Sequence, residues 1–440
     1  MRIVFFSHGT RGDVWPAVAL GARLRGRGHD ITVVTAGEFR PLVEGAGLQF
    51  GRLPVNLTEH LSSEAGQRLL RRGSAAVLRD LQRVYNSHAA ETDDAFVRHG
   101  AGAEAIVAAP VTWDRGQALA DALEVPMAIL YPVPVTRTAA YTCPGLTGRS
   151  APSPLVRRAS FDVAEWIWRR SAASSTAAFR RRLGLPTDGA TTYRRHQHDG
   201  ALGLCTWSPQ VVPRPDDFLA GIHHTGAWTP PAEVRAATDE GLPPELEAWI
   251  AAGDPPVFLG FGSMPVLHPG ALLEDVVAVA RSLGVRAIIS AGWAGNTDVA
   301  LPDHVRLVGA VDHDRLMPLC TAAVHHGGTG TTAASTRAGC PTVVCSVFCD
   351  QPWWGNRIVQ LGVGAHLPFR RLDRRRLETA LRDVLRPEVV ERAGALGAAI
   401  RAEGDGLPAA ATALEDWLVT AEPTPADGTL RRRRRSTAAA

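Results

Sequence analysis

The sequence predicts an α/β protein made of two doubly wound parallel-sheet domains in tandem. Short β-branched and aromatic runs recur in both halves, with segments of helical character between them. A proline-rich, acidic stretch separates the two series. A chain of 440 residues is long enough for two such domains of ordinary size.

The first half opens with a βαβ pattern. Residues 2–7, RIVFFS, are typical of a strand buried on both faces, and residues 16–28 of a helix. Residues 29–36, HDITVVTA, predict the next strand. Further strands are expected at residues 105–110, 126–132 and 200–208. We therefore predict a first domain over residues 1–228.

Residues 229–254 hold four prolines among acidic residues and predict a linker. A second series of strands is expected at residues 256–263, 286–292, 305–311, 322–328 and 341–347. We predict a second domain over residues 255–407, with a helix at 408–421 that packs back toward the first domain. Residues 422–440, rich in arginine, predict a disordered tail.

Composition excludes several classes of function. The net charge is only +3, which gives no global electrostatic case for nucleic acid, and the chain contains no lysine. No apolar run is long enough for a signal peptide or a membrane span. Six cysteines form no CxxC pair, which favours reduced thiols in a cytoplasmic protein. The run RRRRR favours a solvated end, with membrane contact at most peripheral.

A glycine-rich stretch at residues 324–341, VHHGGTGTTAASTRAGCP, predicts a strand, a glycine turn and a helix of small residues. Glycines at a helix N-terminus let backbone N–H groups approach an anion, so the stretch favours an anion site over a turn that only packs. The dinucleotide pattern GxGxxG is absent, and the ATP-binding P-loop needs a lysine. Neither NAD binding nor ATP hydrolysis is supported.

Four motifs together resemble one enzyme family. Residues 325–358 resemble the donor-binding signature of inverting nucleotide-sugar glycosyltransferases of the GT-B fold, above all those of antibiotic pathways and the sterol glucosyltransferases. The motifs GTRGDVWP (9–16), FLGFGSM (258–264) and GAVDHDRLMP (309–318) fall in the same order. The resemblance implies two Rossmann-like domains across a cleft. It also implies transfer from a UDP- or TDP-sugar to a hydroxyl of an apolar small molecule, without a metal or other cofactor.

The resemblance also implies roles for individual residues. His326 would hydrogen-bond the donor diphosphate, whereas His325 would be structural. Asp350 and Gln351 would bond the sugar hydroxyls. The other donor contacts expected are Thr10, Gly12, Ser263, Gly328, Gly330 and Thr331, with Val311 holding the base through its backbone and Trp293 walling the nucleoside pocket.

Asp13 is the expected catalytic base. It follows Gly12 after the first strand, where an acid could simply complement the N-terminus of a helix. The resemblance favours a base that takes the acceptor proton as the sugar is transferred with inversion. Acceptor contacts are expected from His8, Trp113, Tyr131 and Trp353, although His8 could equally be a satisfied loop histidine.

The acceptor pocket is expected in the first domain, from segments 131–145 and 157–183. The second segment clusters Phe161, Trp166, Ile167, Trp168 and Phe179 among arginines. Such a cluster could cover an apolar acceptor, lie on a membrane surface, or pack against its own domain.

Three features leave alternatives open. Asp312 and Asp314 spell a D-x-D metal motif, but they fall in the expected base-binding segment, which disfavours a metal. Thr329 and Trp354 depart from the usual pattern and leave the donor sugar undecided. The rival functions are a nucleotide-sugar epimerase of the same architecture and a non-catalytic activating partner of another glycosyltransferase.

Overall fold

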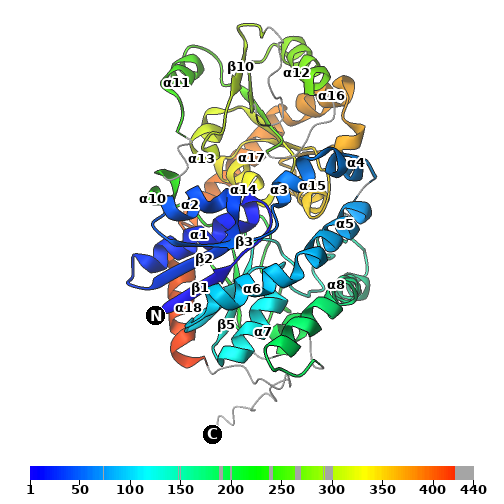
Figure 1. Cartoon of the computed structure of the whole chain (residues 1–440). Coiled ribbons are helices and arrows are strands. Elements are labelled where there is room, and N and C mark those ends of the chain that lie inside the picture. The colour runs from blue at the N-terminus through cyan, green and yellow to red at the C-terminus, as the bar shows by residue number, and fades with distance from the viewer. Residues whose placement is uncertain are drawn as a thin grey trace, which may run out of the picture.

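The computed structural model describes residues 1–72, 74–146, 148, 150–187, 192–198, 201–236, 241–262, 269–290, 292 and 301–421. Two separate sheets form, and every strand pair between described residues is parallel. Figure 1 shows the two sheets stacked one above the other, each with helices around it. The predicted fold class is confirmed.

The first sheet has seven strands in the order β3-β2-β1-β4-β5-β6-β7. Its strands are β1 Arg2–Phe6, β2 Asp30–Ala36, β3 Gln49–Leu53, β4 Ala105–Ala108, β5 Met127–Tyr131, β6 Gly203–Cys205 and β7 Ile222–His224. Its helices are α1 Arg11–Arg25, α2 Arg40–Gly45, α3 Leu57–Ser62, α4 Glu64–Arg72, α5 Ser74–Ser87, α6 Ala89–Gly100, α7 Trp113–Leu123, α8 Pro154–Arg182, α9 Thr192–His198 and α10 Ala232–Ala236.

The second sheet has six strands in the order β10-β9-β8-β11-β12-β13. Its strands are β8 Val257–Gly260, β9 Ala287–Ser290, β10 Val305–Val308, β11 Ala322–His325, β12 Thr342–Val344 and β13 Gly364–His366. The remaining helices are α11 Pro244–Ala251, α12 Pro269–Leu283, α13 His313–Leu316, α14 Thr329–Ala338, α15 Gln351–Gln360, α16 Arg374–Val384, α17 Pro387–Ala402 and α18 Leu407–Thr420.

Strand β1 shows why its sequence is apolar without alternation. Ile3 and Phe5 point into one hydrophobic core, and Val4 and Phe6 into another on the opposite face of the sheet. All four side chains are at most 1% exposed. A strand covered by helices on both faces must be apolar at every position.

The last helix, α18, returns to the first domain. Leu407, Ala410, Ala411 and Leu414 belong to the same core as the buried side chains of α1. Figure 1 shows α18, in red, within the lower half of the molecule. The C-terminal residues of the chain thus complete a core that the N-terminal residues begin.

The expected linker segment carries two short helices. Helix α10 packs against α1 and α2 of the first domain. Helix α11 places Leu246 and Ile250 in a core shared with Phe258 of β8. Residues 237–240, between these helices, and the tail 422–440 lie outside the described residues. The described helices include none that is both long and apolar enough to cross a membrane.

A second link between the halves comes from α3 to α5. Leu57, Leu61 and Val77 share a core with Phe261 and Phe348 of the second domain. This part of the N-terminal half therefore packs against the C-terminal half, on one side of the space between the two sheets.

Candidate active site between the two sheets

A cavity of about 1110 Å³ lies between the two domains. It is lined by the loops that follow β1, β4 and β5 of the first sheet and β8, β11 and β12 of the second. Loops at the carboxyl ends of parallel strands are where ligands bind in open α/β sheets. The cavity therefore joins the binding edges of both domains.

The loop after β1 is built around Asp13. Thr10 is the N-cap of α1 and has an extended backbone, and its N–H donates to Oδ2 of Asp13 at 2.8 Å. The Thr10 hydroxyl donates to the same oxygen at 3.1 Å. Gly9 has a φ of +146°, and a Cβ there would lie 2.3 Å from Oδ2. A glycine is needed so that the carboxylate can fold back over the loop.

The environment of Asp13 suits a base. Burial raises the pKa of Asp13 to about 6, the charge of Asp350 adds to this, and the hydrogen bonds from Thr10 oppose it. Both hydrogen bonds of its carboxylate within the described residues fall on Oδ2, so Oδ1 can accept a proton from a substrate. Asp13 also lines the cavity.

The two adjacent histidines differ in surroundings. His325 is fully buried, accepts from the N–H of Gly327 at Nδ1 (3.0 Å) and lies 3.3 Å from the Ser335 hydroxyl through Nε2. His326 lines the cavity, and its buried Nδ1 has no hydrogen-bond partner among the described residues. His325 thus serves the fold, whereas His326 faces the site.

Two glycines leave room for the His326 ring. A Cβ on Gly262 would lie 3.1 Å from its Cε1, and a Cβ on Gly328 would lie 2.5 Å from its Nε2. Burial lowers the pKa of His326 to about 4, with a further contribution from His313. The imidazole is therefore neutral at pH 7 and offers a hydrogen bond rather than a charge.

Helix α14 presents its N-terminus to the cavity. Gly328 is its N-cap, and Gly328, Thr329, Gly330 and Thr331 all line the cavity. A Cβ on Gly12 would lie 3.9 Å from the backbone nitrogen of Gly330. The N-terminal loops of α1 and α14, from different domains, are therefore in near contact.

Asp350 and Gln351 are held at the start of α15. Oδ2 of Asp350 accepts from Nε1 of Trp354 at 2.8 Å and from the Thr329 hydroxyl at 3.3 Å. Oε1 of Gln351 accepts from the N–H groups of Val347 and Phe348. The two departures from the family pattern, Thr329 and Trp354, thus both position Asp350.

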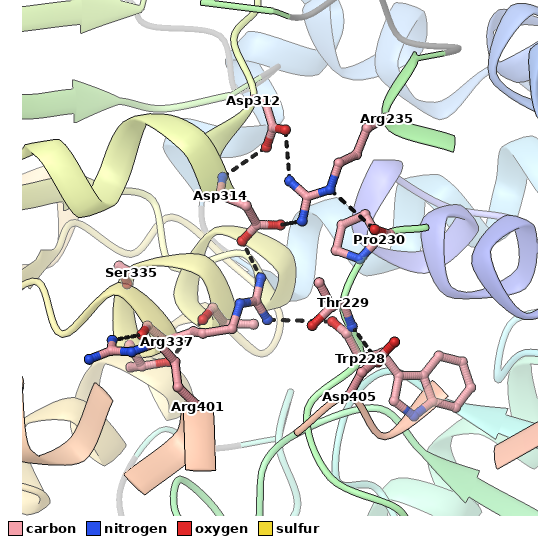
Figure 2. Close-up of polar contacts among 12 residues, drawn as sticks. Trp228, Thr229, Pro230, Arg235, Asp312, Asp314, Ser335, Arg337, Arg401 and Asp405 are labelled. Atoms are coloured by element: carbon pink, nitrogen blue, oxygen red, sulfur yellow. Dashed lines mark hydrogen bonds and ion pairs between the residues drawn. The ribbon is translucent and has the colours of Figure 1, made fainter. Parts of the chain in front are cut away.

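Val311 and the D-x-D residues line the far end of the cavity. Asp312 caps α13 and accepts from Arg235 at 2.8 Å, and Asp314 is paired with Arg337 (Figure 2). Both carboxylates are therefore engaged with arginines. No cluster of three or more metal-ligating side chains occurs among the described residues.

The acceptor residues expected from the sequence divide into two groups. Trp113 lines the cavity. Tyr131 and Trp353 are 0% and 6% exposed and belong to the core behind it, outside the cavity wall. His8 is also behind the wall, since Nε2 donates to the Val55 carbonyl at 2.7 Å and Nδ1 lies 2.6 Å from the Tyr85 hydroxyl. His8 therefore fits the alternative interpretation, a histidine whose ring nitrogens are both hydrogen-bonded within the fold.

Helix α8 forms the wall of the first-domain part of the cavity. Phe161, Ile167 and Trp168 line it, and Nε1 of Trp168 donates to Asp114 at 2.7 Å. Trp166 is 61% exposed and points away from the cavity. Of the expected aromatic cluster, Phe179 is buried in the core.

Some cavity-lining positions are absent from the motif analysis. Tyr85 lines the cavity, and burial, with a smaller contribution from the charge of Asp13, raises the pKa of its hydroxyl. Arg235 lines the opposite end. Neither belongs to a motif, so no signal in the sequence points to them. Ser263 and Trp293, expected at the donor, lie outside the described residues.

The sequence matches two protein-family descriptions. Residues 3–141 match the glycosyltransferase family 28 N-terminal domain. Residues 273–411 match the C-terminal domain of erythromycin biosynthesis protein CIII-like proteins.

Full-length relatives extend this match over nearly the whole chain. The O-mycaminosyltylonolide 6-deoxyallosyltransferase of Streptomyces fradiae is 36% identical over 437 residues, covering 96% of this chain and 98% of the relative. A sterol 3-beta-glucosyltransferase of Arabidopsis thaliana is 31% identical, covering 96% of this chain and 66% of the plant protein.

Solved structures share the fold at lower identity. The glycosyltransferase of kitacinnamycin matches with a TM-score of 0.69 at 20% identity, covering 94% of this chain and 98% of that one. The spinosyn rhamnosyltransferase complexed with thymidine diphosphate matches with a TM-score of 0.61 at 20% identity, covering 94% of this chain and all of that one.

The two-domain fold is of the GT-B type, which these solved glycosyltransferase structures share. The chain belongs to the glycosyltransferase family that contains the macrolide deoxyallosyltransferase and the sterol glucosyltransferases.

Proposed function

We propose that this chain transfers a sugar from a UDP- or TDP-sugar to a hydroxyl of an apolar small molecule, with inversion at the anomeric carbon and Asp13 as base. One observation carries the proposal. The buried carboxylate of Asp13 lies beside the glycine-rich N-terminus of α14. Its pKa is raised, and its Oδ1 can accept a hydrogen bond from a substrate. A base and an anion site therefore meet in one cavity.

The donor diphosphate would lie at the N-terminus of α14. Its backbone N–H groups and the dipole of the helix favour negative charge, and the neutral His326 adds a hydrogen bond. Asp350 and the amide nitrogen of Gln351 would bind the sugar. The TDP complex of the spinosyn enzyme, which shares this fold, supports a nucleoside diphosphate as donor fragment.

The transfer itself is a single displacement. Oδ1 of Asp13 accepts the proton of the acceptor hydroxyl while that oxygen bonds to the anomeric carbon. The bond from the anomeric carbon to the diphosphate oxygen breaks on the opposite face, and its electron pair leaves with the diphosphate. The N-terminus of α14 and His326 stabilise the charge that develops there.

No metal is needed in this scheme. The phosphate charge is met by helix N–H groups and His326, and the carboxylates of the D-x-D segment are engaged by Arg235 and Arg337. We therefore propose a metal-independent enzyme.

The acceptor would occupy the first-domain part of the cavity, beside Trp113, Phe161 and Trp168. Aromatic walls suit an apolar aglycone. The named substrates of the relatives, a tylonolide derivative and sterols, are of this kind. A nucleotide-sugar epimerase would have no use for this half of the cavity, so transfer is the better account.

The test is incubation of the purified protein with UDP-glucose or TDP-sugars and with polyketide aglycones or sterols. We expect an acceptor mass increased by one sugar residue, and an anomeric configuration opposite to that of the donor by NMR. Isomerised donor without any acceptor product would instead establish the epimerase. A bound nucleotide with neither product would support the activating partner.

A further inference from the structure

Two arginines and two aspartates form an ion cluster where the linker meets the second domain (Figure 2). Arg235 of α10 donates to Oδ2 of Asp312 at 2.8 Å and lies 3.5 Å from Oδ2 of Asp314. Arg337, in the last turn of α14, is paired with Oδ1 of Asp314. We call these four residues the linker clamp.

The clamp is largely shielded from water and its charges balance. The side chains of Arg235, Asp312, Asp314 and Arg337 are 27%, 15%, 13% and 16% exposed. Removal of one arginine would leave two close carboxylates with a single cation. A poorly solvated charge without its partner is costly, so the cluster should act as a unit.

The clamp ties the start of the linker to the second domain. Nε of Arg235 donates to the Pro230 carbonyl at 3.1 Å, and NH1 of Arg337 donates to the Trp228 carbonyl at 3.4 Å. The segment between α17 and α18, through which the chain returns to the first domain, contacts the same part of the linker. Oδ1 of its Asp405 accepts from the N–H of Thr229 at 3.0 Å. Figure 2 shows these contacts converging from the linker, α13 and α14.

The clamp also borders the cavity. Pro230, Arg235, Asp312 and Asp314 line it beside Val311, the residue expected at the nucleoside base. Arg337 sits at the other end of α14 from the glycine loop, about 15 Å along a helix of ten residues. One helix thus connects the expected diphosphate site with the clamp.

We propose that the linker clamp is a positioning device for the nucleotide, an inference that rests on the proposed function. It holds the linker as one wall of the nucleoside end of the cavity. It also neutralises Asp312 and Asp314, whose charges would otherwise repel an anionic ligand. Affinity for the nucleotide therefore depends on residues of the linker as well as on the second domain.

The experiment compares Arg235→Met with wild-type protein by calorimetric titration with UDP and with TDP. We expect the dissociation constant of the preferred nucleotide to rise roughly 5–30-fold, in the usual range for a coupling between two parts of a protein. The KM for the donor sugar should rise in parallel. The kcat at saturating donor should change less than about threefold, because no clamp residue touches the reacting atoms in this scheme.

Arg315→Met is the matched control. Arg315 lies on the same helix as Asp314, but its partner Glu247 is 3.7 Å away, and the two side chains are 56% and 49% exposed. This surface pair is outside the cavity wall, so its loss should leave nucleotide affinity unchanged. The double variant Arg235→Met/Asp312→Asn restores the charge balance and should recover part of the lost affinity.

The outcomes separate the two proposals. Unchanged nucleotide affinity in Arg235→Met, or an equal loss in Arg315→Met, would overturn the clamp while leaving the transferase intact. Wild-type protein that binds neither nucleotide would instead overturn the proposed donor. If Arg235→Met does not fold, Arg235→Lys serves in its place. Lysine keeps the positive charge but cannot contact Asp312 and Asp314 through two separate nitrogens, so we expect a smaller loss of nucleotide affinity. Wild-type affinity in Arg235→Lys would overturn the clamp.

Discussion

Helices α1 and α14 make an informative pair. Each follows the central region of a parallel sheet through a loop of histidine and glycine, and each opens onto the same cavity. They differ in their first turns. Helix α1 carries Asp13 there, whereas α14 has no acid and offers glycines and threonines.

The difference teaches what makes a helix N-terminus an anion site. In α1 the carboxylate of Asp13 already accepts the N–H of Thr10, so the helix caps itself with its own negative charge. In α14 the cap is Gly328, with no side-chain hydrogen bond to the helix. An external anion would be repelled by the first helix and attracted by the second, so the proposed base and the proposed phosphate site would use the same kind of fold element.

The largest expected effect comes from Asp13→Asn. Turnover should fall by roughly 10²–10⁴-fold, the range for a lost general base, while binding of the nucleoside diphosphate is kept. Steady-state kinetics and calorimetry measure the two quantities. Asp373→Asn is the control, because the Asp373 carboxylate also accepts a backbone N–H at the start of a helix, as the N-cap of α16, but lies outside the cavity wall. Near-wild-type turnover in Asp13→Asn would remove Asp13 from its catalytic role.

On the α14 side, His326→Ala tests the phosphate site. Loss of a hydrogen bond to a charged phosphate costs about 1.5–3 kcal/mol, or roughly 10–150-fold in donor affinity. His325→Ala should chiefly lower the melting temperature, because that ring is fully buried and bonded within the fold. Calorimetric titration beside a melting curve separates the two. Nucleotide binding abolished only in His325→Ala would reverse these roles.

The pH dependence of kcat/KM should report the ionisation of Asp13 in the first turn of α1. With a pKa of about 6, Asp13 is protonated at lower pH and cannot accept a proton, so kcat/KM should fall about tenfold per pH unit below that value. The Thr10 hydroxyl lowers the pKa of Asp13, so Thr10→Val should move the acid limb to higher pH. An acid limb at the same pH in both proteins would assign it to another group.

The smallest effect is expected from removing metals. Activity should persist in excess EDTA, because α14 and His326 would do the work of a metal ion. Activity lost in EDTA and restored by magnesium or manganese would contradict metal independence and would reopen the interpretation of the D-x-D segment as a metal site.

The sequence predicts the interior of both sheets better than their edges. All ten strands expected from apolar runs are present, and the three that the pattern misses are β3, β7 and β13. Each lies at the edge of its sheet. An edge strand is covered less completely, so it can be short and polar, as Ile222–His224 is, and then carries no recognisable pattern.

The same reasoning applies to the site. The residues expected at the donor fall in continuous motifs, and every one of them that the structure describes lines the cavity. Tyr85 and Arg235 reach the cavity only because α5 and α10 fold over it. Tyr131 and Trp353, expected to contact the acceptor, lie in the core and do not line the cavity. An aromatic residue in the sequence near a site can pack in the core as readily as it can line the cavity.

The return of α18 to the first domain has a consequence for how the protein is made. The core around Val14 and Val18 is closed by Leu407, Ala410 and Leu414, at the opposite end of the chain. During synthesis the apolar face of the first domain therefore stays uncovered until residues 407–414 have left the ribosome. We therefore expect the nascent N-terminal half to be prone to aggregation, and we expect production of the first domain alone to require α18 fused to it.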